Sequence, residues 1–205
     1  METDKDKDLP IIDAEGTITL YSLTTLSPHP PFTILGKEDI PLFTILTVII
    51  NQEEREVFAL CRGTGEEGYC IAYYNIDTEY RQRTSLLTLC PRMMHGTSIC
   101  FNYSKRILFL GGVEGYGNGY ESMVPAVYAL SCQGNDIGYL DQIEIGGIES
   151  TQGVHTIKAH YKADIVLATY GSQIVMASLE NKKFQKYRII DKYSDSTIYQ
   201  SIFNG

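Results

Sequence analysis

The sequence has no tryptophan, no long apolar run and no excess of positive charge. Its 205 residues include 17 Lys and Arg against 25 Asp and Glu, which gives a formal net charge of -8 at pH 7. Such a chain has no overall positive field that would attract nucleic acid or an anionic membrane surface. The longest apolar candidate, 43–50, is far shorter than the ~18 residues that a membrane helix needs. We therefore expect no nucleic-acid partner and no membrane partner.

Metal-binding and secretory motifs are also missing. The five cysteines include no Cys-x-x-Cys pair, and their odd number argues against both a zinc site and a complete disulfide framework. Their apolar neighbours favour buried, reduced thiols. The N-terminal segment 1–8 alternates charges, unlike a secretory signal. We expect a cytoplasmic protein without a cofactor or metal, with a disordered tail over residues 1–16.

Tyrosine and glycine are abundant instead. The chain has 15 Tyr and 18 Gly, and Val, Ile and Thr are frequent in short runs. These residue types are typical of strands and tight turns. The composition predicts an all-β fold.

A repeat of about 50 residues organises the chain. The segments 44–60, 97–110 and 155–168 each contain a strand, a polar turn and an apolar strand. The first apolar residues after the turn are Val57, Ile107 and Ile165, at intervals of 50 and 58 residues. Two further strands follow in each unit, and four strands per ~50 residues is the pattern of a β-propeller blade.

The expected further strands complete about four four-stranded blades over residues 17–205. The third strands are expected at 69–76, 125–130 and 173–179, and the fourth at 85–89, 140–145 and 184–190. The segment 17–23 is expected to be the third strand of an incomplete earlier unit. The chain is thus either a small propeller or an incomplete or half propeller.

The glycine-rich segment 111–122 is predicted to be a long mobile hairpin loop. Consecutive backbone N–H groups in such a loop can bind anions. However, no helix follows Gly112, and Glu114 and Glu121 would repel a phosphate. A simple hairpin is therefore favoured over a nucleotide site.

Two histidines are expected at the mouth of the propeller channel. His95 and His155 occupy matching places in the sequence, just before the innermost strands of successive blades, whereas His160 falls in the following turn. Propeller proteins commonly hold ligands at this mouth. His155 is the candidate catalytic residue, with a structural histidine as the alternative.

The segments 143–155, 161–172 and 174–179 resemble the propeller lactonases, the family of 6-phosphogluconolactonase and of enzymes that act on carboxymuconate. Val154-His155 stands where that family has a Cys-His pair, and Thr169-Tyr170-Gly171 stands for Asn-Tyr-Gly. The segment 103–110 resembles the family's Ser-Pro-Asp-Gly-Arg turn and strand. The family has seven blades, so the likeness covers only its N-terminal half.

The resemblance implies hydrolysis of a sugar or carboxy lactone, with His155 polarising or deprotonating the reacting groups. The family's Pro-Asp-Gly turns are degraded here, and its later cationic segments have no match in the chain. A second hypothesis is a non-catalytic propeller module that binds a protein or completes its ring with a second chain. An unpaired blade edge would also permit self-association.

Overall fold

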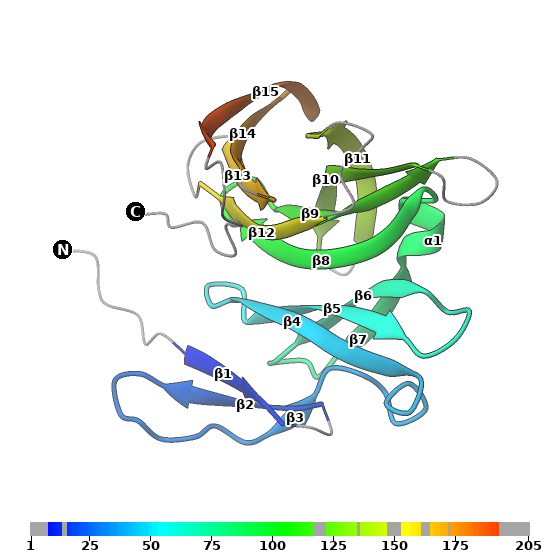
Figure 1. Ribbon diagram of the computed structural model, residues 1–205. Coiled ribbons are helices and arrows are strands. Elements are labelled where there is room, and N and C mark those ends of the chain that lie inside the picture. Colours follow the sequence, from blue (N-terminus) through cyan, green and yellow to red (C-terminus); the bar gives the residue numbers. More distant parts are fainter. Residues whose placement is uncertain are drawn as a thin grey trace. The chain divides into compact units, whose positions relative to one another are not determined.

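The computed structural model describes residues 8–13, 16–116, 122–134, 136–146, 153–160, 165–171 and 173–192. The chain divides into two compact units, Met1–Thr84 and Ser85–Gly205. Every sheet is an antiparallel meander whose strands are neighbours in sequence (Figure 1).

Unit 1 contains a three-stranded sheet A and a four-stranded sheet B. Sheet A is formed by β1 (Asp8–Ile12), β2 (Thr17–Ser22) and β3 (Phe32–Thr33). Sheet B is formed by β4 (Phe43–Asn51), β5 (Glu56–Gly63), β6 (Tyr69–Asn75) and β7 (Arg81–Ser85). The strands that we expect at 44–60 and 69–76 are confirmed.

Unit 2 begins with the short helix α1 (Leu86–Leu89) and continues with two four-stranded sheets. Sheet C is formed by β8 (Met93–Asn102), β9 (Ile107–Tyr116), β10 (Ser122–Gln133) and β11 (Asp136–Glu144). Sheet D is formed by β12 (Val154–Ala159), β13 (Ile165–Tyr170), β14 (Gln173–Glu180) and β15 (Lys183–Lys192). The all-β fold of repeated four-stranded units is therefore confirmed, with one sheet of three strands.

The structure corrects three details. The expected disordered tail does not extend over Asp8–Ile12, which forms β1, while residues 1–7, 14 and 15 lie outside the described residues. The fourth strand of sheet B is Arg81–Ser85, and the residues after it form α1, in which the Ser85 hydroxyl accepts a hydrogen bond from the Leu87 N–H. This is the bond of an N-cap, and leucine is a good helix former. The third detail is the glycine-rich segment, whose residues up to Tyr116 belong to β9.

A common turn joins the first two strands of sheets B and C. Each turn ends with an arginine of positive φ, Arg55 at 52° and Arg106 at 53°. The carbonyl of Arg55 accepts a hydrogen bond from Ile76, and that of Arg106 accepts one from Cys132, both at 2.9 Å. The two turns are therefore held against the third strand of their sheets in the same way.

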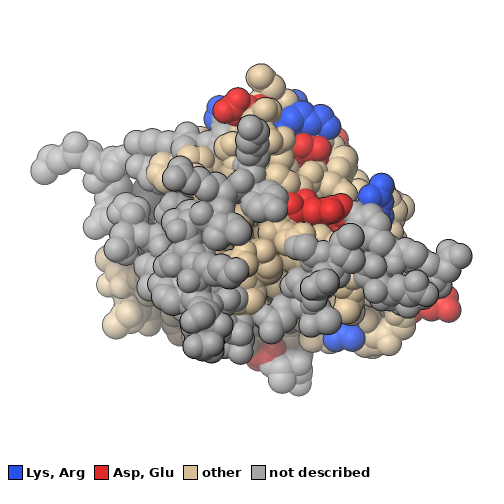
Figure 2. All heavy atoms as spheres, turned by 45° about the horizontal axis from the view of Figure 1, so that its top comes forward, with Lys and Arg blue, Asp and Glu red and all other residues tan. Residues whose placement is uncertain are grey.

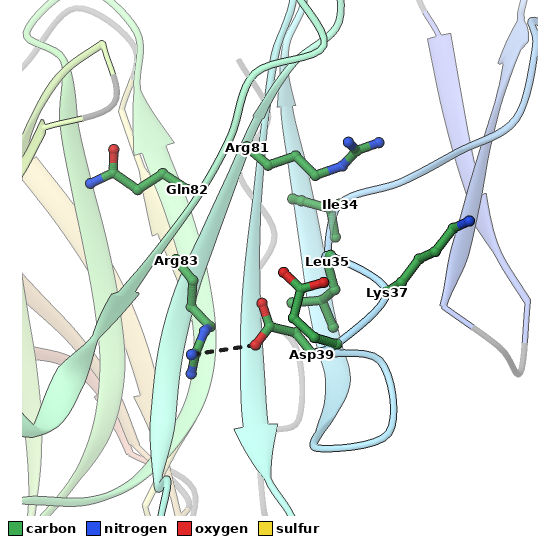
Figure 3. A pocket seen from close by; sticks show the side chains of 9 residues that line it. Ile34, Leu35, Lys37, Asp39, Arg81, Gln82 and Arg83 are labelled. Carbon is green, nitrogen blue, oxygen red and sulfur yellow. Dashed lines mark ion pairs between the residues drawn. The ribbon is translucent and has the colours of Figure 1, made fainter.

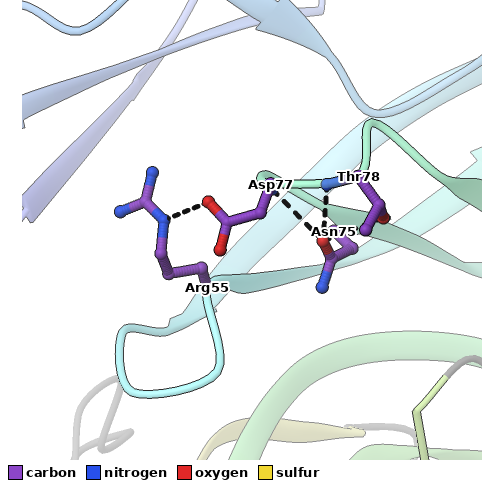
Figure 4. Close-up of polar contacts among 4 residues, drawn as sticks. All are labelled: Arg55, Asn75, Asp77 and Thr78. Atoms are coloured by element: carbon purple, nitrogen blue, oxygen red, sulfur yellow. Dashed lines mark hydrogen bonds and ion pairs between the residues drawn. The ribbon is translucent and has the colours of Figure 1, made fainter.

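The arginine side chain strengthens the first of these contacts. Arg55 Nε donates to Asp77 Oδ1 at 2.6 Å, in the turn after β6 (Figure 4). The Asn75 side chain shapes that turn, since its Oδ1 accepts from the N–H groups of Asp77 and Thr78. In sheet C, Arg106 Nε instead donates to the Cys132 carbonyl at 2.8 Å. In both turns an arginine therefore occupies the positive-φ position that glycine usually takes in a tight turn. Its side chain adds a hydrogen bond to the turn.

Each unit has its own core between its two sheets. In unit 1, Ile18 and Leu20 of β2 pack with Val57 and Ala59 of β5. In unit 2, Phe109 and Val127 of sheet C pack with residues of β13 and β14, among them Ala168 and Val175. Alternate residues of β2 are buried, as expected of a strand with one face against a neighbouring sheet.

Candidate functional site

The first strand of each four-stranded sheet contains a β-bulge at the same place. Pairing with the second strand skips Leu46 in β4, Thr97 in β8 and His155 in β12. Each bulged residue lies five positions before the residue that precedes the turn, namely Asn51, Asn102 and His160. His155 is therefore equivalent to Leu46 and Thr97.

The matching of His95 with His155 is wrong. His95 pairs with Val113, two positions before the bulge at Thr97, so its counterpart in sheet D is Gly153. The His95 side chain is exposed, whereas that of His155 is half-buried. The sequence comparison missed this offset because a bulge shifts register without leaving a mark in the hydrophobic pattern.

His155 lies in a partly dry environment. Burial lowers the pKa of its imidazole below the usual value of 6.5, because desolvation disfavours the charged form. Its Nε2 atom lies beneath the surface. At neutral pH the ring is uncharged, so His155 can accept a proton.

Strands β8 and β12 lie side by side and are joined near both ends (Figure 1). The Thr97 hydroxyl donates to the carbonyls of Gly111 and Val154, and Asn102 Nδ2 donates to the His160 carbonyl at 3.0 Å. The bulge residue of one sheet thus binds the first strand of the next. We call this region the C–D contact.

The glycine-rich segment forms part of the C–D contact and is a strand up to Tyr116, which corrects the predicted loop. A Cβ atom on Gly111 would lie 2.6 Å from Val154 Cγ1, and one on Gly112 would lie 2.5 Å from the His95 carbonyl oxygen. A Cβ on Gly153 would collide with Val113. These glycines are explained by close strand approach, not by an anion site. Residues 117–121 lie outside the described residues.

Sheets B and C each bury a carboxylate that is bound by a tyrosine. Tyr73 Oη donates to Glu56 Oε1 at 3.0 Å, and Tyr128 Oη donates to Glu114 Oε1 at 2.7 Å. Glu114 and Tyr128 have no exposed surface. Such pairs fix the packing of neighbouring strands, because an unsatisfied buried carboxylate is costly. These pairs were not predicted from the sequence, although a glutamate inside an apolar strand is a signal for them.

A charged cleft lies in unit 1, between β7 and the segment that follows β3. It has a volume of about 330 Å³. Its lining residues are Ile34, Leu35, Gly36, Lys37, Glu38, Asp39, Arg81, Gln82 and Arg83. Figure 3 shows the side chains of Arg81 and Arg83 reaching from their strand toward the segment with Ile34 and Asp39. No local pattern in the sequence predicts this cleft.

All five cysteines are buried and form no disulfide bond, which agrees with the expectation of buried, reduced thiols. Burial raises the pKa of Cys90 to about 12, so its thiol stays protonated and is a poor nucleophile. Among the described residues no three His, Cys, Asp or Glu side chains form a group that could hold a metal ion. In the same part of the chain, no helix is long and apolar enough to cross a membrane.

Charges of both signs are interspersed on the described part of the face in Figure 2, where acidic and basic side chains lie next to one another. This distribution gives no single-sign surface there that would resemble a nucleic-acid footprint.

No family model matches the sequence, and no curated protein matches it significantly. The fold is similar to that of Sqt1 from Saccharomyces cerevisiae, with 11% identity and a TM-score of 0.61. That alignment covers 98% of this chain and 49% of Sqt1. The structure of U3-55K is also similar, at 10% identity and a TM-score of 0.47, covering 91% of this chain and 63% of that one.

Sqt1 is a β-propeller protein of the WD40 type, and its similarity gives no support to the lactonase resemblance. At 11% identity this similarity establishes the fold alone. The chain spans about half the length of Sqt1. It is an all-β protein built from propeller-type blades.

Proposed function

We propose that the protein is a non-catalytic β-propeller module that binds another protein through the outward faces of its first and last sheets. The observation that carries this proposal is a difference in burial. Residues 57–61 of β5 and 126–130 of β10 have no exposed surface, so both faces of these strands are covered. In β2 and β14 only alternate residues are buried.

The outward face of sheet A is apolar at its edge. Leu9 and Ile11 of β1 are each 48% exposed. They pair with Tyr21 and Thr19 of β2, so the four side chains lie on one face, opposite the core residues Ile18 and Leu20. Removing this apolar surface from water would favour association.

The outward face of sheet D is apolar as well. Leu167 of β13 lies opposite Met176 of β14, and Ile165 and Ile174 share their face by strand alternation. All four are half-buried, whereas Val166, Ala168 and Val175 on the other face belong to the core. Two sheets can pack face to face through such surfaces.

The occupant that we propose is a second copy of this chain. The two faces differ from each other, so sheet A of one copy would pack on sheet D of the next. Such a head-to-tail contact is heterologous, and it closes a ring or continues as an open chain according to its rotation. This arrangement would cover the outward faces of sheets A and D, whose strands β2 and β14 bury only alternate residues. It uses a sheet face instead of an open blade edge.

Sedimentation over a range of protein concentrations tests this proposal. Wild-type protein should associate, while Ile11→Glu and Leu167→Glu should each associate at least tenfold more weakly. An equimolar mixture of the two variants should recover dimers, because each keeps one intact face. Leu87→Glu is the matched control, since Leu87 is 50% exposed on α1. Thermal melting of each variant reports its folding.

Two results would contradict the proposal. Wild-type protein that is monomeric at every concentration would rule out a second copy as the occupant. A mixture of folded variants that stays monomeric, while the wild type associates, would rule out the head-to-tail contact.

Lactone hydrolysis through His155 is the second candidate function. The lowered pKa of its half-buried imidazole favours it, since a neutral ring can act as a general base. Hydrolysis of a sugar lactone by the pure protein should then fall at least a hundredfold in His155→Ala, and His95→Ala is the control. Equal rates for wild-type protein and His155→Ala would exclude this activity of His155.

A further inference from the structure

The charged cleft of unit 1 lies beside a strand edge. Strand β7 is the last strand of sheet B, and its outer edge pairs with no other described strand. Arg81 and Arg83 are alternate residues of this strand, so they share one face and lie about 6.6–7 Å apart along it. Gln82 points away from that face (Figure 3).

The Arg81 guanidinium is held in a fixed position. Its Nε donates to the Thr33 carbonyl at 2.8 Å, and its Cζ lies 5.0 Å from the centre of the Tyr74 ring. That ring stacks on Phe32 at 4.6 Å. The terminal Nη groups form no hydrogen bond with the described residues, so a preoriented fork faces outward.

The Arg83 guanidinium is held in a similar way, but its positive charge is partly neutralised by a carboxylate. Its Cζ lies 4.5 Å from the centre of the Phe43 ring, and its Nη2 is 3.3 Å from Asp39 Oδ1. The side chain of Asp39 is 17% exposed and that of Arg83 is 38% exposed. A single contact to one carboxylate oxygen leaves the other donors of the guanidinium available.

The cleft is less acidic than the chain as a whole. Three cations, Lys37, Arg81 and Arg83, line it with two carboxylates, Glu38 and Asp39. The Glu38 carboxylate folds back over Gly36, and Lys37 has no ion-pair partner among the described residues. A positive site on a chain of net charge -8 selects for anionic ligands locally.

We infer that this cleft binds an extended acidic peptide segment that pairs with the outer edge of β7. Residues of an added antiparallel strand lie 4.5–5.5 Å from their partners between Cβ atoms, about the spacing of opposite-charge cross-strand pairs. Alternate side chains of the peptide would face Arg81 and Arg83, and main-chain bonds to β7 would supply register. Alternating acidic residues are therefore the preferred sequence.

Asp39 acts as an internal competitor in this arrangement. Its carboxylate occupies the position at Arg83 that a ligand carboxylate would take. Replacing Asp39 with asparagine keeps its shape and removes that competition. An acidic peptide should therefore bind more tightly to Asp39→Asn than to the wild type. A merely structural ion pair predicts no gain.

The probe is a fluorescent, terminally blocked peptide of alternating glutamate and valine, and its control has glutamine in place of glutamate. Fluorescence anisotropy at low salt should show binding of the acidic peptide alone. Arg81→Gln should weaken it at least tenfold, Arg83→Gln severalfold and Lys37→Gln less. Arg62→Gln is the matched control, because Arg62 is an exposed arginine of the same sheet outside the cleft.

Several outcomes would overturn the inference. Equal binding of the two peptides would remove the charge requirement. Equal losses in Arg81→Gln and Arg62→Gln would show a general charge effect. Inorganic phosphate that competes at the peptide's own affinity would indicate a simple anion site. Unchanged or weaker peptide binding by folded Asp39→Asn would exclude the competitor role. The cleft and the sheet faces are separate, so failure of one proposal leaves the other testable.

Discussion

Strands β10 and β14 are both third strands of four-stranded sheets, yet they differ in burial. Residues 126–130 of β10 have no exposed surface, whereas β14 buries every second residue. Both are largely apolar, so the difference lies in what covers the second face. β5 and β2 show the same contrast in unit 1. An apolar strand can therefore be buried on both faces, and the elements packed around it decide whether one face or both are covered.

The contrast also assigns different roles to similar residues. Side chains of the doubly covered strands stabilise the fold, whereas the apolar side chains on the outward faces of sheets A and D stay exposed or half-buried. Polar pairs inside the covered sheets, such as Glu114 with Tyr128, are structural. Mutations on the two kinds of strand should thus have different consequences.

The largest difference is expected between Phe58→Ala and Leu9→Ala. Phe58 is fully buried in β5, and its loss should cost about 3–5 kcal/mol of unfolding free energy, as for other core aromatics. Leu9 is 48% exposed, and its replacement should cost less than about 0.5 kcal/mol. Urea denaturation measures both. Equal costs would contradict the burial contrast.

Tyr128→Phe should be the next most severe change. It removes a 2.7 Å hydrogen bond to a fully buried carboxylate, at a cost of about 1.5–3 kcal/mol. Tyr139→Phe is the control, because Tyr139 is 43% exposed. Denaturant midpoints of the two variants test the expectation. A loss no larger for Tyr128→Phe than for Tyr139→Phe would show that the pair does not stabilise sheet C.

Gly111→Ala should disturb the C–D contact. The new methyl group would lie 2.6 Å from Val154 Cγ1, so the two sheets must separate, at about 1–3 kcal/mol. Gly65→Ala is a matched control, since only the flexible Glu67 carboxylate lies near its Cβ position. The melting temperatures of the two variants measure this difference in stability. A stability of Gly111→Ala equal to that of Gly65→Ala would refute close approach there.

The smallest expected effect concerns pH and His155. Its pKa is lower in the folded protein than in the unfolded chain, so the unfolded chain binds the proton first as pH falls. The contribution of the neutral imidazole to folding stability is fully present above pH 6.5. It is lost as the pH falls through the pKa of His155 in the folded protein. His155→Gln should therefore reduce the loss of stability between pH 7 and pH 5. An unchanged pH profile would contradict the lowered pKa.

Much of the fold follows from local patterns in the sequence. The apolar runs around Val57, Ile107 and Ile165 predicted the second strands correctly, because strands of this kind need apolar residues on both faces. The polar strand β7 was missed, since its arginines gave no such run. The expected strand at 85–89 is a helix because a capping serine precedes leucines.

The candidate sites depended more on tertiary structure. Sequence spacing paired His155 with His95, and a β-bulge moved the correspondence to Thr97. The glycines at 111 and 112 looked like a loop, and contact with Val154 and His95 explains them inside a strand. The cleft beside β7 joins residues more than 40 positions apart, which no local pattern predicts.

The sequence by itself determined the all-β class, the repeat of about 50 residues and the reduced, buried character of the cysteines. These properties depend on side-chain hydrophobicity and on turn residues that act over a few positions. Only the tertiary structure decided which strands have two covered faces and which histidine lies in the bulge. It also decided that Arg83 meets Asp39 and that Arg81 lines the same cleft. Those features arise from packing between segments that are distant in the sequence. Neighbouring strands set the register of each strand, and neighbouring sheets decide which of its faces are buried.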